Sequence, residues 1–145
     1  MEQISPQVDL LINLAKAQTV LASKFTNGCL GSLSFNEFLV LHHVSQSGVD
    51  GIQRIALAKK VGLSASGVTR LLAPMEKIHL ITNDEVERDA RIRLVQITDA
   101  GRERFADALD RLDLLSESII PSASKKDIQY VSDFLLSVAV QAQIA

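Results

Sequence analysis

The segment from Arg54 to Arg70, RIALAKKVGLSASGVTR, constrains the fold more than any other part of the chain. Ala58 is small enough to let two helices cross closely, and Gly62, four residues later, suits a turn that needs a positive φ. Ser64 can cap a second helix, on which Val68 would pack back against the first. The spacing predicts two short helices joined by a tight turn, with the space between them filled by Leu57, Val61, Leu63 and Leu71.

Two interpretations fit such a helical pair. In a helix-turn-helix, the second helix presents its first turns to the major groove of DNA. In an ordinary helical hairpin, the same spacing serves only the packing of a bundle core. The surrounding sequence has to separate the two.

Length and charge set the next limits. The 145 residues are enough for one domain with a sizeable core. The whole chain carries 15 Lys/Arg against 17 Asp/Glu, but the stretch from Asp50 to Arg104 carries 10 against 8 and is its most basic part. An excess of two positive charges is weak support for DNA binding, although it suits a reader of DNA whose flanking helices serve another purpose.

Other classes of protein find little support in the sequence. Cys29 is the single cysteine, which excludes an intrachain disulfide framework, fits a reducing compartment and is interpreted as an inert thiol. There is no signal-like start and no apolar run of about 18–20 residues, so we expect a soluble cytoplasmic protein without membrane contact. His42 and His43 would point about 100° apart on a helix and could not chelate one metal ion together. No catalytic set, phosphate loop or metal spacing appears, so we expect neither an enzyme nor a cofactor.

Capping and breaking residues predict six helices. Ser5-Pro6 should start the first, which runs to about Thr26, and a capping box at Ser34-Phe-Asn-Glu37 should start the second. The expected ranges of the others are about 52–61, 65–79, 100–118 and from 125 onward. On the second helix, which should span about 35–47, the expected inward residues are Phe38, Leu39, Leu41 and Val44.

Two segments between the fourth and fifth helices favour strands instead. They are Leu80–Thr82 and Arg91–Thr98, and a polar loop over 83–90 should join them. The alternation in the second makes Ile92, Leu94 or Val95, and Ile97 its candidate inward residues. Two strands and a charged loop directly after a candidate recognition helix describe a wing. The predicted fold class is therefore mainly α with a small β-wing: a winged helix-turn-helix domain plus N- and C-terminal dimerisation helices.

Both terminal helices carry more apolar surface than one small core needs. The first has two stripes, one from Val8 to Ala22 and one from Leu10 to Leu21, where the surface helix of a monomer usually has one. The last repeats apolar residues at steps of three and four, which is typical of helices packing on helices, across chains or within one. This seam consists of Ile128, Val131, Leu135, Val138 and Ala142.

At this point the chain resembles the MarR family of winged helix-turn-helix transcriptional regulators. The stretch SASGVTRLLAPMEKIHLI resembles that family's recognition helix, and Asp89-Ala90-Arg91, followed by LVQIT and Gly101, resembles its wing and the start of the next helix. The resemblance implies one domain over 1–145, with the reader at about 34–98 and dimerisation helices at about 5–27 and 99–145. It also implies a homodimer on double-stranded DNA, with wings that reach neighbouring minor grooves. A small-molecule or redox cue would change the spacing between the DNA-binding parts of the two chains.

The candidate DNA-binding residues lie on the recognition helix and the wing. Ser and Thr can contact base edges or phosphates, and Arg can hold guanine in a bidentate way. Alternatives stay open: Ser64 is a cap in either case, Gly67 either permits close approach to a groove or is merely tolerated, Arg70 could form an internal salt bridge, and Arg91 could be a solvated charge. Asp89 is interpreted as a structural residue at the base of the wing and not as a DNA contact. The set is Ser64, Ser66, Gly67, Thr69, Arg70, Arg88, Arg91 and Arg93.

Three departures from the family pattern stand out. The wing begins with Thr82-Asn83-Asp84-Glu85, where relatives commonly have basic residues, so its arginines must supply the phosphate contacts. Pro74 interrupts the recognition helix, and His79 stands where a helix-ending glycine is common. The sequence predicts a homodimeric repressor that binds a pseudo-palindromic operator sequence-specifically and is released by a small ligand. The alternative is a winged-helix protein–protein interaction module that has lost DNA affinity.

Overall fold

The tight helical pair expected around Gly62 is present in the computed structural model, which describes residues 3–26, 28–86 and 89–145. Helix α3 (Arg54–Val61) ends at Gly62, which has φ +80°, and helix α4 (Ala65–Lys77) follows. The amides of Gly62 and Leu63 both donate to the carbonyl of Ala58, at 2.9 and 3.0 Å. This left-handed cap turns the chain so that Val68 of α4 is fully buried beside α3.

Local capping also sets the first two helices where the sequence predicted them. Helix α1 (Pro6–Phe25) starts with proline in its first turn, and the hydroxyl of Ser5 accepts from the amide of Val8. Helix α2 (Phe35–Gln46) starts with the reciprocal box, in which Glu37 N donates to Ser34 Oγ at 3.2 Å and Ser34 N donates to Glu37 Oε2 at 2.8 Å. Each bond satisfies a donor that the helix start leaves unpaired.

The sheet has three strands, where the sequence predicted two. Strands β1 (Ile52–Gln53), β2 (Ile81–Val86) and β3 (Asp89–Ile97) are antiparallel in the order β1-β3-β2. The expected third helix therefore starts at Arg54 and not at Ile52, because Ile52 and Gln53 pair with Val95 and Leu94. A turn of 3-10 helix, η1 (Gly48–Asp50), precedes β1.

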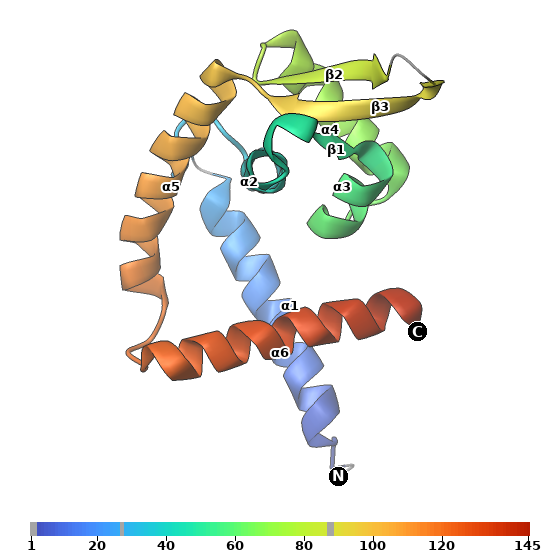
Figure 1. Ribbon diagram of the computed structural model, residues 1–145. Coiled ribbons are helices and arrows are strands. Elements are labelled where there is room, and N and C mark those ends of the chain that lie inside the picture. The colour runs from blue at the N-terminus through green and yellow to red at the C-terminus, as the bar shows by residue number, and fades with distance from the viewer. Residues whose placement is uncertain (1–2, 27, 87–88) are drawn as a thin grey trace. The chain divides into compact units, whose positions relative to one another are not determined.

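The predicted loop over 83–90 is also wrong for most of its length. Its first residues continue β2 as far as Val86, and Asp89 already begins β3, so the two strands form a long hairpin beside α3 and α4 (Figure 1). The side chains of Asp84 and Glu85 are exposed while their backbone pairs with Leu94 and Arg93. Polar composition therefore did not prevent strand pairing, because a hairpin of this kind leaves side chains in solvent.

The core lies between α2, α3, α4 and the sheet. On α2, Phe38, Leu41 and Val44 are buried as expected, but Val40 is also buried and Leu39 only half-buried. In β3 the inward residues are Val95 and Ile97, whereas Ile92 and Leu94 are half-buried. The largest fully buried side chains are Leu30, Leu41, Leu57, Leu72, Met75, Leu80, Ile81, Val40, Val44, Val68 and Val95.

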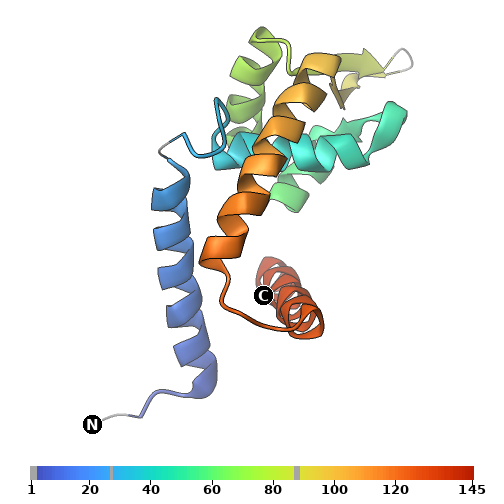
Figure 2. The same ribbon diagram turned by 90° about the vertical axis from the view of Figure 1, so that its left-hand side faces the viewer.

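Helix α5 (Asp99–Ile119) leads from the sheet along this core. The hydroxyl of Thr98 caps it by accepting from Gly101 N at 3.0 Å. The ring of Phe105 lies 5.2 Å from that of Phe38, so α5 packs on α2 (Figure 2). The chain divides into two compact units, Met1–Asp113 and Leu114–Ala145, with the boundary inside α5.

The terminal helices carry largely uncovered apolar residues. Along α1 only Phe25 is buried, and Leu14 and Leu21 are half-buried. In the second unit, Ser124 caps helix α6 (Lys125–Ile144), in which no residue is buried. The exposed side chains of α6 include Ile128, Val131, Phe134, Leu135, Leu136, Val140 and Ile144. None of the described helices is long and apolar enough to cross a membrane.

Candidate nucleic-acid interface

Helix α4 has one buried face and one exposed face. Val68, Leu72 and Met75 are buried and attach the helix to the core. Ser66, Thr69, Arg70 and Ala73 are exposed at steps of three and four, which puts them on the opposite face. Four of the predicted site positions, Ser64, Ser66, Thr69 and Arg70, thus lie together at the exposed start of this helix.

The first turn of α4 is organised around the Ser64 hydroxyl. Ser64 Oγ accepts from Gly67 N at 3.0 Å and lies 3.3 Å from Ser66 Oγ. A Cβ at position 67 would lie 3.1 Å from Ser64 Oγ, which is tighter than most real contacts. Gly67 therefore has a structural reason, since it leaves room for the cap.

Thr69 and Arg70 differ in how much of their bonding capacity is used. The hydroxyl of Thr69 donates to the carbonyl of Ala65 at 3.0 Å, so its lone pairs stay available to a donor. The exposed side chain of Arg70 makes no hydrogen bond or ion pair with any other described residue. Its five donors are therefore available to a partner outside this chain.

The three predicted wing arginines stand differently. Arg88 lies outside the described residues, and of Arg91 only the backbone, in β3, is described. Arg93 Nη2 donates to Glu85 Oε1 at 2.9 Å across the hairpin, and Nη1 donates to the carbonyl of Asn83 at 3.4 Å. The side chain of Arg93 is 40% exposed and that of Glu85 53% exposed, so this ion pair faces solvent.

A pocket of about 260 Å³ lies where the recognition helix meets the wing, and we call it the wing pocket. Arg54, in the first turn of α3, lines it together with Arg93. Sequence reasoning missed Arg54, because a third helix expected to start at Ile52 places this residue inside the helix. The lining consists of Gln53, Arg54, Ile55, Ala65, Thr69, Ile92 and Arg93.

The end of the recognition helix differs from the usual glycine exit, as the sequence indicated. The helix continues through Pro74 to Lys77, although proline leaves the carbonyl of Arg70 without its usual helical donor. His79 takes the left-handed conformation, at φ +61°, and its carbonyl accepts from Thr98 Oγ1 at 2.6 Å. A hydrogen bond between the helix exit and the start of α5 thus supports a conformation that histidine does not favour.

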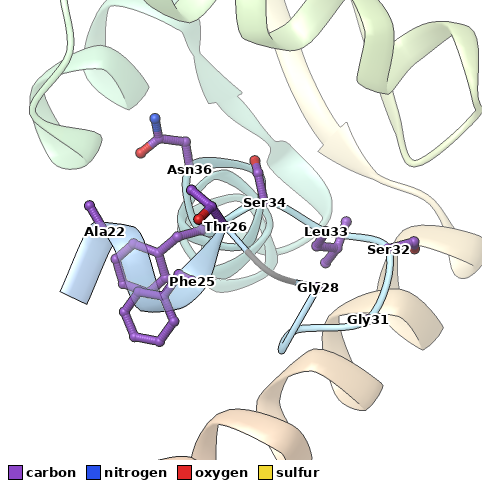
Figure 3. A pocket seen from close by; sticks show the side chains of 10 residues that line it. Ala22, Phe25, Thr26, Gly28, Gly31, Ser32, Leu33, Ser34 and Asn36 are labelled. Carbon is purple, nitrogen blue, oxygen red and sulfur yellow. The ribbon is translucent and has the colours of Figure 1, made fainter. Parts of the chain in front are cut away.

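A second pocket, of about 460 Å³, lies at the junction of α1 and α2, and we call it the junction pocket. Phe25 at the end of α1 lies on one side, and the loop through Gly28, Gly31 and Leu33 passes along the other (Figure 3). Phe25 stacks on Phe35 with ring centroids 4.4 Å apart, which gives the pocket an aromatic wall. Its polar lining comes from Thr26, Ser32, Ser34 and Asn36.

The histidines and the cysteine lie in the same unit. Burial lowers the pKa of His43, and the neighbouring His42 and Lys60 lower it further. Cys29 is half-buried, and its thiol lies 3.5 Å from the carbonyl of Lys24. Within residues 3–26, 28–86 and 89–145, no group of three His, Cys, Asp or Glu side chains could hold a metal ion.

An exposed helix after a left-handed turn, followed by a two-stranded hairpin and a long helix, defines a winged helix-turn-helix protein. No protein-family model matches the chain. A curated relative, the uncharacterized HTH-type transcriptional regulator YdgJ of Bacillus subtilis (strain 168), is 29% identical over 133 residues, which cover 90% of this chain and 77% of that protein.

Several solved structures with the same fold are MarR-family regulators. AbsC, a MarR family transcriptional regulator from Streptomyces coelicolor, superposes with a TM-score of 0.80 over 100% of both chains at 17% identity. Sco3205, another MarR family regulator from that organism, was solved in complex with DNA and gives 0.77 at 15% identity, covering 96% of this chain and 89% of its own. CouR from Rhodococcus jostii RHA1, bound to p-coumaroyl-CoA, gives 0.78 at 21% identity, covering 94% and 96%. The chain has the MarR fold, and its resemblance to MarR-family regulators is confirmed. These relatives are transcriptional regulators and not enzymes.

Proposed function

We propose that this protein is a sequence-specific DNA-binding transcriptional regulator of the MarR family. The observation that supports it most is the exposed start of α4, where Ser66, Thr69 and Arg70, which pairs with no described residue, lie on the face opposite the buried one. A helix held in this way can enter a major groove with its first turns toward the base edges. The proposed DNA contacts are those of the predicted set, in which Arg88, Arg91 and Arg93 are the contacts made by the wing.

The proposal includes a homodimer, in which residues 1–145 act as one MarR-type domain. The support is the absence of any buried residue in α6 and the exposed apolar side chains of α1, such as Leu11 and Ile12. Left uncovered, these residues would expose more apolar surface than monomers normally do. Two chains joined by these helices would place two recognition helices about one DNA turn, or about 34 Å, apart on a pseudo-palindromic operator.

Repression and release by a small ligand complete the proposal, together with a cytoplasmic location. Support for the ligand comes from the junction pocket, whose volume of about 460 Å³ lies within the usual range for small molecules and whose lining is partly aromatic and partly polar. A thermal-shift screen of small aromatic compounds, followed by DNA release assays with those that raise the melting temperature, tests this part. If no compound that stabilises the protein releases the DNA, this part of the proposal fails.

Binding to randomised duplex DNA, with sequencing of the bound fraction, tests the main proposal. We expect enrichment of two inverted half-sites about one helical turn apart. The acidic start of the wing, with Asp84 and Glu85 exposed, favours the second candidate, an interaction module without DNA affinity. A bound fraction without sequence preference, or no binding at physiological salt, would support that candidate instead.

A further inference from the structure

The wing pocket contains two arginine side chains and lies beside the recognition helix. Arg54 is half-buried there and makes no hydrogen bond or ion pair with any other described residue. Arg93 enters from β3, and none of the seven lining residues is acidic. The donors of this half-buried guanidinium, which no described residue uses, can therefore bind a ligand that supplies acceptors.

The other lining residues fit a small anion attached to a larger molecule. The amide of Gln53 adds a donor, whereas Ile55 and Ile92 add apolar walls. Ala65 and Thr69 belong to the first two turns of α4, the part proposed to enter the major groove. The groups on either side of a major groove are the phosphates of the two DNA strands, and guanidinium binds phosphate in a bidentate way.

We propose that the wing pocket seats a backbone phosphate of duplex DNA, held by Arg54 and Arg93, and that Glu85 competes with this phosphate for Arg93. The inference rests on the proposed function and adds a site to it. The carboxylate of Glu85 already occupies the guanidinium of Arg93 at 2.9 Å in the absence of DNA. DNA binding replaces one charge-assisted pair by another, so Glu85 lowers the affinity without abolishing it.

Asp84 provides a matched control for Glu85. It is the adjacent residue, is exposed like Glu85 and carries the same charge, but its backbone pairs with Leu94 and its carboxylate makes no hydrogen bond or ion pair with Arg93. Neighbouring side chains of a strand point to opposite faces. Neutralising Asp84 therefore measures the general repulsion between the acidic wing and DNA, whereas neutralising Glu85 also frees Arg93.

The experiment measures affinity by fluorescence anisotropy over a range of salt concentrations, with the full chain and the duplex selected by the unmodified protein. We expect Arg54→Ala and Arg93→Ala to weaken binding equally on selected and random duplex. Each should flatten the slope of log K against log salt by about one unit per bound chain. Arg54→Lys and Arg93→Lys keep the positive charge, so their salt slopes should lie between those of the alanine variants and that of the unmodified protein. A melting temperature for every variant separates loss of binding from loss of folding.

The carboxylates decide the second half of the proposal. We expect Glu85→Gln to raise affinity about two- to fivefold, the usual range for releasing a solvent-exposed ion pair, and Asp84→Asn to raise it less. In the Arg93→Ala background, the gain from Glu85→Gln should fall to that from Asp84→Asn, because only general repulsion is then left to relieve. Equal gains from both substitutions that persist without Arg93 would show general repulsion and overturn the competition.

The outcomes also separate this inference from the proposed function. Normal salt slopes in folded Arg54→Ala and Arg93→Ala proteins, together with selective DNA binding by the unmodified protein, would overturn the phosphate site and leave the function intact. No DNA binding by the unmodified protein would overturn both.

Discussion

Gly101, in the first turn of α5, lies directly against the main-chain carbonyl of Leu80, the last residue before β2. A Cβ on Gly101 would overlap that oxygen and would lie 2.9 Å from Cγ1 of Ile97. The same carbonyl accepts from the amide of Thr98 at 3.1 Å. The recognition helix, the wing and α5 are therefore joined at a point where the backbones touch without an intervening side chain.

Gly101→Ala should destabilise the protein because its methyl group has no room at this point. Overpacking of this kind usually costs about 1–3 kcal/mol, and here the obstacle is backbone, which cannot rotate away. Urea denaturation measures the loss. Gly67→Ala serves as a milder comparison, because its Cβ would lie 3.1 Å from Ser64 Oγ and 3.7 Å from Leu63 Cβ and would meet no backbone, so an equal loss in both variants would contradict the explanation.

His79→Gly should stabilise the protein by about 0.5–1 kcal/mol. His79 has φ +61°, a conformation that costs a side chain about 1–2 kcal/mol and glycine much less, and the entropy that glycine loses on folding offsets part of the gain. The bond from Thr98 to the carbonyl of residue 79 remains in the variant. His79→Ala keeps the backbone strain and should bring no gain in stability. An equal gain in both variants would show that the gain comes from removing the imidazole side chain and not from relieving the strain.

His43 should make the stability depend on pH. Its pKa is lowered in the folded state, mainly by burial and then by His42 and Lys60, so the unfolded state binds the proton more tightly. The contribution of His43 to the free energy of unfolding is fully present above the ordinary histidine pKa of about 6.5. It is lost as the pH falls from there toward the lower pKa of the folded state. Melting temperatures of the unmodified protein and of His43→Gln, measured at pH 7.5 and at pH 5.5, test this. The melting temperature should fall less between pH 7.5 and pH 5.5 in His43→Gln than in the unmodified protein. An identical fall in both proteins would exclude His43 as a cause of the pH dependence.

Arg70→Ala should weaken binding mainly to the selected sequence. A bidentate contact with a base contributes about 1–3 kcal/mol, and its loss should relax the preference at one base pair of each half-site. Competition between the selected duplex and single-base variants measures that preference. An equal loss on selected and random duplex would make Arg70 a phosphate contact.

Leu135→Asp should dissociate the dimer and abolish operator binding. The change places a charge in the seam with Ile128 and Val131, which we expect to lie in an interface above about 2,000 Å². Sedimentation at micromolar concentration and DNA titration measure the two effects. Ser137→Asp adds the same charge about 200° around α6 and should leave the dimer intact. A folded monomer of the unmodified protein at that concentration would contradict the dimer.

Local sequence determined where α2 and α4 begin. Ser34 and Glu37 are three residues apart, so their reciprocal bonds form within one turn and need no distant partner. Gly62 likewise sets the turn between α3 and α4, because the left-handed φ is open to it. The exposed start of α4 followed from these local rules, and most of the predicted recognition-helix residues are found there.

Tertiary structure decided the features that depend on partners far away in the chain. Ile52 and Gln53 became a strand because Leu94 and Val95, about forty residues later, supply their hydrogen bonds. Val40 is buried because α2 is covered on more than one face, which a single helical stripe does not indicate. Arg54 and Arg93 line one pocket, and Glu85 pairs with Arg93, only through the register of the hairpin and its place beside α3. Residues adjacent in sequence constrain each other through short-range sterics and capping, whereas contacts between distant segments form only when the whole core selects one arrangement.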